Sequence, residues 1–141
     1  IHFIMLGDGP DGEPFREESQ HLRNMEWLGF KKNPGDYFAA LDLFVFPSRN
    51  EGLGSTLLDV MDFRVPIIAS DVDGIPDIVK HEEAGLLIPV NNADALAEAI
   101  LRLFNNKPLR EGLAITAKEK LDNFTPASMA KRYLALYRSL L

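Results

Sequence analysis

The sequence contains no cysteine and no long hydrophobic run, and basic residues are the minority among its charges. Without cysteine, the chain can form neither a disulfide framework nor a thiolate site for catalysis or metal binding, which suits a reducing compartment. Its apolar runs stop well short of the roughly 18 residues that a membrane-spanning helix needs, and no signal-peptide pattern opens the chain. We therefore predict a cytoplasmic globular protein.

The charge balance argues against one class of partner. Lysine and arginine total 15 against 21 aspartates and glutamates, so the formal net charge is -6. Surfaces that bind nucleic acid carry the opposite balance, and we predict no nucleic-acid partner. An anionic ligand would have to be held by local dipoles, backbone amides and a few well-placed cations.

Short apolar runs alternate with helical patterns along most of the chain. This alternation predicts an α/β fold, a Rossmann-like doubly wound parallel sheet, whose continuous apolar strands should be buried on both faces. We expect strands at residues 3–6, 26–28, 43–46, 66–69 and 85–88, and helices at residues 13–24, 34–40, 55–63, 75–80 and 93–105.

After residue 106 the pattern is helical only. One helix is expected at residues 108–123, and a second should begin at Pro126 with Thr125 as its cap. Its apolar stripe comprises Met129, Tyr133, Leu136, Tyr137 and Leu140. We predict core packing for this stripe, with the alternative that the last helix docks onto a missing domain and leaves part of its surface exposed here. We predict a single domain over residues 1–141 with a helical tail at 107–141. Because Ile1 already opens an apolar strand, we interpret the chain as a fragment of a longer protein.

The candidate site lies in residues 46–56, where a strand ends, a polar loop follows and a helix begins near Gly54 or Ser55. Ligands of open parallel sheets bind beyond the carboxyl ends of the strands, and helix N-termini suit phosphate groups. The glycines of this loop permit close approach of the backbone, and the hydroxyls of Ser55 and Thr56 add hydrogen-bond donors.

Two acidic residues, Glu51 and Asp59, frame this turn with seven residues between them. Asp59 is placed to accept ribose hydroxyls beside a bound phosphate, and Glu51 to accept hydroxyls of a sugar. Alternatively, Glu51 only complements the helix dipole and Asp59 is merely solvated. The residue pattern alone leaves both interpretations open.

A family resemblance bears on this choice. Residues 47–54, the segment Asp59-Val60-Met61 and residues 66–70 resemble the signature of GT4-type retaining glycosyltransferases. Residues 6–10, 28–30, 74–79 and 83–89 agree with the same family in order and spacing. The resemblance implies a GT-B fold of two facing Rossmann-like domains. This chain would be the C-terminal, nucleotide-sugar-binding domain, without the N-terminal acceptor domain and the first βα unit.

The resemblance also implies roles for individual residues. Glu51 would be the catalytic residue of the pair and would contact the transferred sugar, and Asp59 would hold the ribose. The amides of the following turn would face the diphosphate, and a second loop would lie along the base. The implied donor-binding residues are Gly29, Phe30, Lys31, Gly52, Leu53, Gly54, Ser55, Thr56 and Asp59.

The implied reaction is transfer of a sugar from a nucleoside-diphosphate sugar with retention at the anomeric carbon, without a metal ion or other cofactor. Basic side chains and helix-terminal amides would assist departure of the diphosphate. The implied partners are the nucleotide sugar and the missing acceptor domain, through which any peripheral membrane association would occur. We expect the isolated fragment to be inactive.

Two positions depart from the family pattern. Asp59 is one methylene shorter than the usual glutamate, and Arg64 stands at a helix end that normally favours a left-handed glycine. These departures keep open the hypothesis of a non-catalytic binding module with a decayed site. A separate alternative is a GT-B nucleotide-sugar epimerase or phosphorylase, which would share the sheet but should lack the geometry of the acid pair.

Other patterns suggest sites that we do not favour. Residues 7–12 fit the dinucleotide fingerprint G-x-G-x-x-G, but Asp8, Asp11 and Glu13 would crowd a pyrophosphate with carboxylates. The triplet ending in Asp73 resembles the D-x-D of metal-dependent glycosyltransferases, yet those enzymes have a different fold. His2, His21 and His81 are scattered, and we interpret them as structural or solvated.

Overall fold

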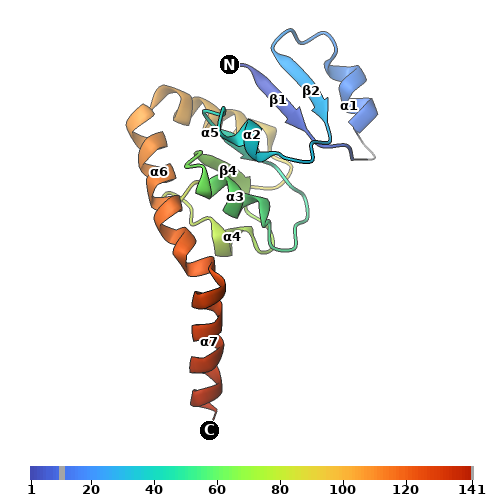
Figure 1. Ribbon diagram of the computed structural model, residues 1–141. Helices are drawn as coiled ribbons and strands as arrows, with labels where there is room; N and C mark the ends of the chain where they lie inside the picture. The colour runs from blue at the N-terminus through green and yellow to red at the C-terminus, as the bar shows by residue number, and fades with distance from the viewer. Residues whose placement is uncertain (10–11, 141) are drawn as a thin grey trace. The chain divides into compact units, whose positions relative to one another are not determined.

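The computed structural model describes residues 1–9 and 12–140, which divide into two compact units, Ile1–Asp36 and Tyr37–Leu141 (Figure 1). Each unit contains a parallel β sheet with flanking helices, so the chain has the α/β, Rossmann-like class that the sequence predicts. The parallel sheet of the first unit has two strands and that of the second unit has three. Hydrophobic periodicity identifies strands but not which of their edges pair.

The first unit contains β1 (Phe3–Leu6), α1 (Gly12–Ser19) and β2 (Met25–Gly29). The two strands pair in parallel, with Phe3 opposite Met25 and a register shift between Met5 and Leu6. Helix α1 ends five residues before the predicted boundary. The Ser19 hydroxyl donates to the carbonyl oxygen of Phe15 at 2.7 Å and accepts from Nε1 of Trp27 at 2.8 Å. A serine that bonds in this way competes with continued helix formation.

The predicted burial of β1 on both faces is wrong. Its central residue Ile4 is 37% exposed, and Met5 is exposed to a similar degree. A continuous apolar run is typical of a strand covered on both sides, but coverage depends on what packs there, which the run itself does not specify.

The second unit contains β3 (Phe44–Phe46), β4 (Ile67–Ser70) and β5 (Leu86–Ile88), all parallel, with β4 in the centre. The five strands among the described residues each lie within one residue of their predicted bounds. The helices are α2 (Gly35–Phe38), which crosses the boundary between the units, α3 (Thr56–Asp62), α4 (Ile75–Ile78), α5 (Ala93–Asn105), α6 (Lys107–Lys120) and α7 (Pro126–Ser139), with a 3₁₀ turn at Leu121–Phe124.

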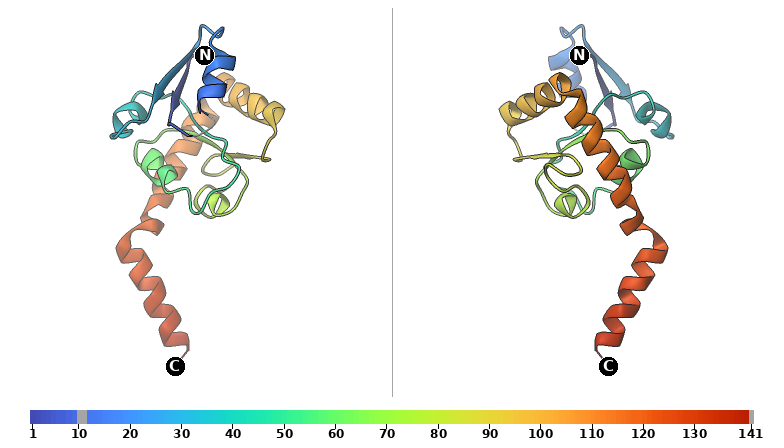
Figure 2. Two further views of the ribbon diagram at one scale, coloured as in Figure 1. Left: turned by 90° about the vertical axis from the view of Figure 1, so that its right-hand side faces the viewer. Right: turned by 90° about the vertical axis from the view of Figure 1, so that its left-hand side faces the viewer.

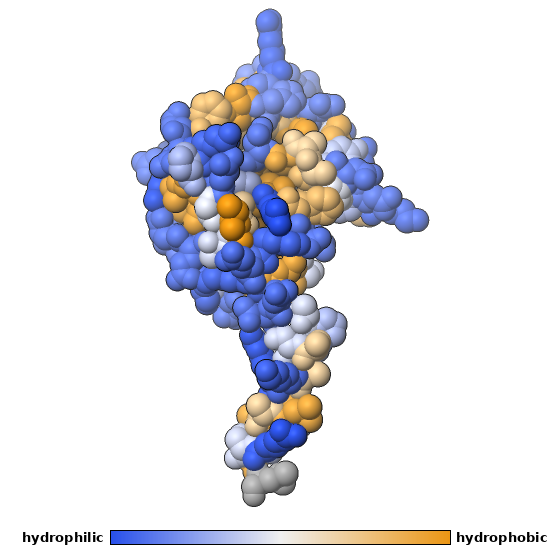
Figure 3. Space-filling view, turned by 60° about the vertical axis from the view of Figure 1, so that its left-hand side comes forward, coloured by the Kyte–Doolittle hydropathy of each residue, from blue (hydrophilic) through white to orange (hydrophobic). Residues whose placement is uncertain are grey.

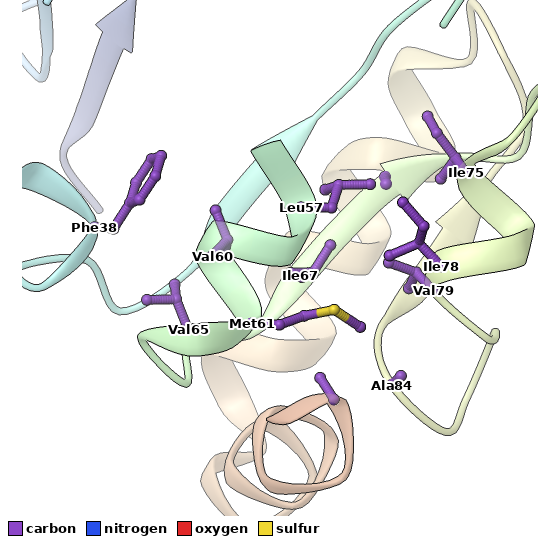
Figure 4. Packing of buried hydrophobic residues seen from close by; sticks show 12 residues of the cluster. Phe38, Leu57, Val60, Met61, Val65, Ile67, Ile75, Ile78, Val79 and Ala84 are labelled. Carbon is purple, nitrogen blue, oxygen red and sulfur yellow. The ribbon is translucent and has the colours of Figure 1, made fainter. Parts of the chain in front are cut away.

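The core of the second unit lies on both faces of β4. Ile67 and Ala69 face one buried cluster and Ile68 faces another, as the two-residue periodicity of a strand requires. Figure 4 shows Leu57 and Met61 of α3 directed toward Ile67, so this short helix is held by its buried side. This packing fixes the position of α3 and of the loop that precedes it.

Helix α3 ends in a Schellman motif with Arg64 in the left-handed conformation, φ +57°. The amide of Arg64 donates to the carbonyl oxygen of Met61 at 3.0 Å, and that of Val65 donates to Val60 at 3.3 Å. Val65 is buried, so the chain turns directly into β4. The sequence correctly marked Arg64 as a side chain in a position that favours glycine.

The two long C-terminal helices differ in burial. Helix α6 buries Leu113, Ala114 and Ala117, whereas α7 buries no residue. The cap of α7 is as predicted, because Thr125 Oγ1 accepts from the amide of Ser128 at 3.2 Å. The prediction of core packing for its apolar stripe is wrong, since the five side chains are between 53% and 75% exposed.

Both views of Figure 2 show α7 running clear of the sheet of its unit, and Figure 3 shows apolar and polar residues side by side on its surface. Within residues 1–9 and 12–140, no helix is both long and apolar enough to cross a membrane.

Candidate functional site

Two loops follow the carboxyl ends of neighbouring strands in the second unit. Residues 47–55 connect β3 to α3, and residues 71–74 connect β4 to α4. Because β3 and β4 are adjacent and parallel, both loops emerge at the same edge of the sheet. We refer to residues 47–55 as the acidic-glycine loop and to residues 71–74 as the bracing loop.

The acidic-glycine loop ends at a helix start with unused amide groups. Helix α3 begins at Thr56, one residue later than predicted, and Ser55 makes no side-chain capping bond. The amide of Leu57 donates to the carbonyl oxygen of Gly54 at 2.9 Å. Within the described part of the chain, the amides of Ser55 and Thr56 donate to no backbone carbonyl. They remain available to an anionic ligand.

Gly54 has a specific structural role in this loop. It is buried, and its φ of +72° is a conformation that residues with a Cβ rarely adopt. A Cβ at this position would lie 3.2 Å from Cδ1 of Leu57 and 3.4 Å from Cγ of Glu51. The stem of the Glu51 side chain therefore folds back over Gly54, which limits where its carboxylate can point.

The backbone of Glu51 is held by the bracing loop. The amide of Glu51 donates a hydrogen bond to Oδ2 of Asp73 at 2.8 Å. The two loops also approach closely at Gly74, where a Cβ would lie 2.5 Å from the carbonyl oxygen of Gly52. Sequence reasoning missed both contacts, although the position of Asp73 and Gly74 directly after a strand was a usable signal.

Asp73 was considered above only as part of a metal-binding triplet. In the structure its carboxylate accepts a hydrogen bond from the Glu51 amide. Among the residues that the structure describes, no group of three histidine, cysteine, aspartate or glutamate side chains could hold a metal ion.

Asp59 lies on the solvent-facing side of α3. Its side chain is exposed, whereas Leu57, Val60 and Met61 on the other side of the helix are buried. Residues three or four apart share a helix face, so the Asp59 carboxylate lies on the same face as Ser55 and Thr56. None of the ion pairs among the described residues involves Asp59 or Glu51. Both carboxylates can accept hydroxyl groups of a ligand.

The remaining predicted donor-binding residues belong to the first unit. Gly29 ends β2 with φ +68°, and its carbonyl oxygen accepts from the amide of Gly7 at 3.1 Å. Phe30 follows with 73% of its surface exposed, and Lys31 is half-buried. The second unit thus contains Glu51, Asp59 and the turn between them, whereas the loop at Gly29 belongs to the first unit.

The glycine-rich segment after β1 also lies in the first unit. Gly7 has φ +130°, and the amide of Gly12 donates to the carbonyl oxygen of Gly9 at 2.9 Å. Pro10 and Asp11, on which the dinucleotide hypothesis partly depends, lie outside the described residues.

The histidines form no catalytic arrangement in the described residues. Nδ1 of His81 accepts from the amide of Leu87 at 2.9 Å, so this imidazole has a structural role. Nε2 of His2 lies 3.8 Å from Oε2 of Glu26, with both side chains exposed. His21 is exposed.

Comparison with known proteins gives a consistent picture. The sequence model of the family described as "Glycosyl transferases group 1" matches residues 1–106. The N-acetyl-alpha-D-glucosaminyl L-malate synthase of Bacillus anthracis is 27% identical over 145 residues, which cover 98% of this chain and 37% of the relative. The lipopolysaccharide core biosynthesis mannosyltransferase LpsB of Rhizobium meliloti is 35% identical over 122 residues, which cover 82% of this chain and 34% of the relative.

A solved structure resembles the chain along its whole length. HepE from Anabaena in complex with UDP-glucose aligns with a TM-score of 0.84 and 21% identity, over 100% of this chain and 41% of that one. At this identity the match shows that the chain has the fold of one part of a GT-B glycosyltransferase. The chain spans little more than a third of the length of the two curated relatives named above.

Proposed function

Because the chain belongs to the glycosyl transferases group 1 family, we propose that it binds a nucleoside-diphosphate sugar at the acidic-glycine loop. In the longer protein, this half would present the donor for transfer of its sugar to an acceptor. The chain would then be the C-terminal domain of a glycosyltransferase of the GT4 type, with residues 107–141 as its helical tail. The acceptor domain would be supplied by residues that precede those in this chain.

The observation that carries the proposal is the arrangement of two carboxylates around unused backbone amides. Glu51 is held over Gly54, the Ser55 and Thr56 amides follow directly, and Asp59 lies one turn further on the same helix face. A nucleotide sugar presents its groups in the same order, with sugar hydroxyls, diphosphate and ribose hydroxyls in sequence. In this assignment Glu51 accepts from the sugar and Asp59 from the ribose.

The diphosphate should be the hardest part of the donor to bind, because the chain itself has a net charge of -6. The Ser55 and Thr56 amides and hydroxyls supply uncharged donors, which stabilise the charge that develops on a leaving diphosphate. We propose that Gly52 and Leu53 line the same surface and that Gly29, Phe30 and Lys31 contact the base. The exposed ring of Phe30 suits stacking on a base.

We further propose that transfer proceeds with retention at the anomeric carbon and requires no metal ion. In this assignment the longer protein acts in the cytoplasm, and the isolated chain binds its donor but does not catalyse transfer. These assignments are tested on the longer protein, by the anomeric configuration of the product and by activity in the presence of a metal chelator.

The donor site is tested by nuclear magnetic resonance on the ¹⁵N-labelled chain, titrated with UDP, GDP, ADP and NAD. We expect one nucleoside diphosphate to shift the amides of Gly54, Ser55 and Thr56. Asp59→Ala should lower the affinity for that nucleotide by about tenfold, the loss expected for a hydrogen bond to a charged group. Glu51→Gln should leave the affinity for the nucleotide unchanged and lower only the affinity for the corresponding nucleotide sugar.

Asp42→Ala is the matched control, because Asp42 is an exposed carboxylate at the amino end of β3. It should change neither affinity. Shifts produced by NAD at Gly7 and Gly9 would instead favour dinucleotide binding at the turn after β1. If no nucleotide binds this chain or the longer protein, the family fold serves here as a binding module without a donor site.

A further inference from the structure

Asp73 is the only residue whose side chain bonds to the Glu51 backbone within the described part of the chain. We propose that Asp73 is a positioning residue, which holds the Glu51 backbone so that its carboxylate meets the sugar of the donor. The inference rests on the proposed function for the role of Glu51. It adds Asp73 to the residues that donor binding requires. Asp73 is not a member of the pair of Glu51 and Asp59, and it lies 22 residues from Glu51 in the sequence.

The first support is that Glu51 lies in a loop without helix or strand hydrogen bonds. A side chain on such a loop is aimed only by contacts that the loop makes elsewhere. Two of these are now visible: the side-chain stem rests over Gly54, and the backbone amide is bonded to Asp73. One contact restrains the side chain and the other restrains the main chain, so together they limit the direction of the carboxylate.

The second support is the backbone conformation of Asp73. Its φ of +49° lies in the left-handed region, where a non-glycine residue is strained but aspartate and asparagine are tolerated better than other residues. Strain of this kind persists where surrounding contacts over-determine it, and it concentrates at functional sites. Here the conformation turns the Asp73 carboxylate back toward the acidic-glycine loop, where it accepts from Glu51.

The third support is the close packing at Gly74. A Cβ at Gly74 would lie 2.5 Å from the carbonyl oxygen of Gly52 and 3.1 Å from Cα of Leu53, so no side chain fits at this position. The bracing loop is therefore seated against the acidic-glycine loop by packing as well as by the hydrogen bond. Loss of the Asp73 carboxylate should free the Glu51 amide while the packing at Gly74 keeps the loops together.

The experiment compares Asp73→Gly with Asp73→Asn in the ¹⁵N-labelled chain. Glycine adopts the left-handed conformation without cost but removes the acceptor, whereas asparagine tolerates this conformation and keeps an acceptor oxygen. The first measurement uses no ligand and follows the chemical shift and hydrogen exchange of the Glu51 amide. We expect faster exchange and a large shift change in Asp73→Gly, and a return toward the native values in Asp73→Asn.

The second measurement is the ratio of the affinity for a nucleotide sugar to that for its nucleoside diphosphate. UDP-glucose with UDP, GDP-mannose with GDP and ADP-glucose with ADP are the probe pairs. Asp73→Gly should lower this ratio about threefold to tenfold, the range expected for one lost hydrogen bond, while the nucleoside diphosphate binds as before. Asp73→Asn should recover most of the loss, and Asp71→Asn, which alters a neighbouring exposed carboxylate, should leave the ratio unchanged.

An unchanged Glu51 amide in Asp73→Gly would overturn the inference. So would equal weakening of nucleotide sugar and nucleoside diphosphate, because that result would indicate general loosening of the site. If the Glu51 amide responds but no probe pair binds the native chain, the proposed function fails while the bond between Asp73 and Glu51 stands. The two failures can therefore be told apart.

Discussion

The turn after β1 and the turn after β3 look alike in sequence, since each follows an apolar strand and carries glycines and carboxylates ahead of a helix. They differ in what their backbones touch. A Cβ added at Gly7, Gly9 or Gly12 would meet nothing within 4 Å, whereas one at Gly54 would meet three side chains. Glycine spacing therefore does not identify a built site, and close packing around the glycine is the better indicator.

A related contrast holds for the sheets that carry the two turns. β3, which leads into the second turn, is partly buried and pairs with β4, whose residues are all buried, whereas the middle of β1 is exposed. The turn after β3 is thus anchored on a packed core and held by a second loop. The following predictions test this difference, from the largest expected effect to the smallest.

Truncation of a strand residue should have very different costs in the two units. Ile67→Ala removes a fully buried side chain of β4 and should lower the free energy of unfolding by about 2–5 kcal/mol. Ile4→Ala in β1 should cost about 1 kcal/mol or less, because Ile4 is already 37% exposed. Urea unfolding of both variants measures the difference, and equal losses would contradict the contrast between the strands.

Substitution of a glycine should be costly where the bracing loop packs on the turn after β3, and nearly neutral in the turn after β1. Gly74→Ala forces a Cβ to within 2.5 Å of the Gly52 carbonyl oxygen and should cost about 1–3 kcal/mol of stability. It should also shift the amide resonances of Gly52 and Leu53. Gly9→Ala, the matched control in the turn after β1, meets nothing within 4 Å and should be nearly neutral. A neutral Gly74→Ala would mean that the bracing loop is not seated as described.

Removal of the side chain at the end of α3 should be stabilising. Arg64 has φ +57°, a conformation that costs an ordinary residue about 1 kcal/mol relative to glycine. Arg64→Gly should therefore raise the free energy of unfolding by about that amount and leave donor binding unchanged. Thermal unfolding of the variant provides the test. A loss of stability would show that Arg64 forms a compensating contact.

The smallest expected effect is a dependence of stability on acid pH that arises from two exposed ion pairs of the second unit. The hydrogen bond from Arg102 holds the pKa of Glu82 below its ordinary value of 4.5, and the hydrogen bond from Lys120 lowers the pKa of Glu83 in the same way. Each carboxylate then stabilises the folded chain at pH above the ordinary value. This contribution is lost as the pH falls through the lowered folded-state pKa.

Glu82→Gln should remove part of this loss of stability between neutral and acid pH, measured as the change in melting temperature. The effect should be slight, because the pair is exposed to solvent. Glu98→Gln is the control, since Glu98 forms none of the ion pairs in the described residues. A variant at Glu82 that shows the full native pH dependence would contradict the assigned role of the pair.

Much of the local structure could be predicted from the sequence. Hydrophobic periodicity placed the five strands of residues 1–9 and 12–140 to within one residue and placed helix α5 at its observed bounds. The cap at Thr125 was also predictable, because it depends on the chemistry of a few consecutive residues. The acidic residues around the helix start could be named for the same reason. The family resemblance marked Arg64 as standing where a left-handed glycine is usual, and Arg64 does adopt that conformation.

What the sequence by itself determined is thus the set of elements and the side chains available at the end of β3. Only the tertiary structure decided which strands pair within each unit, that β1 and the stripe of α7 are exposed, and that the Asp73 carboxylate accepts a hydrogen bond from the Glu51 amide. The reason is physical: capping and periodicity depend on neighbours along the chain. Burial and the pairing of loops depend on residues that come together only when β3 and β4 lie side by side.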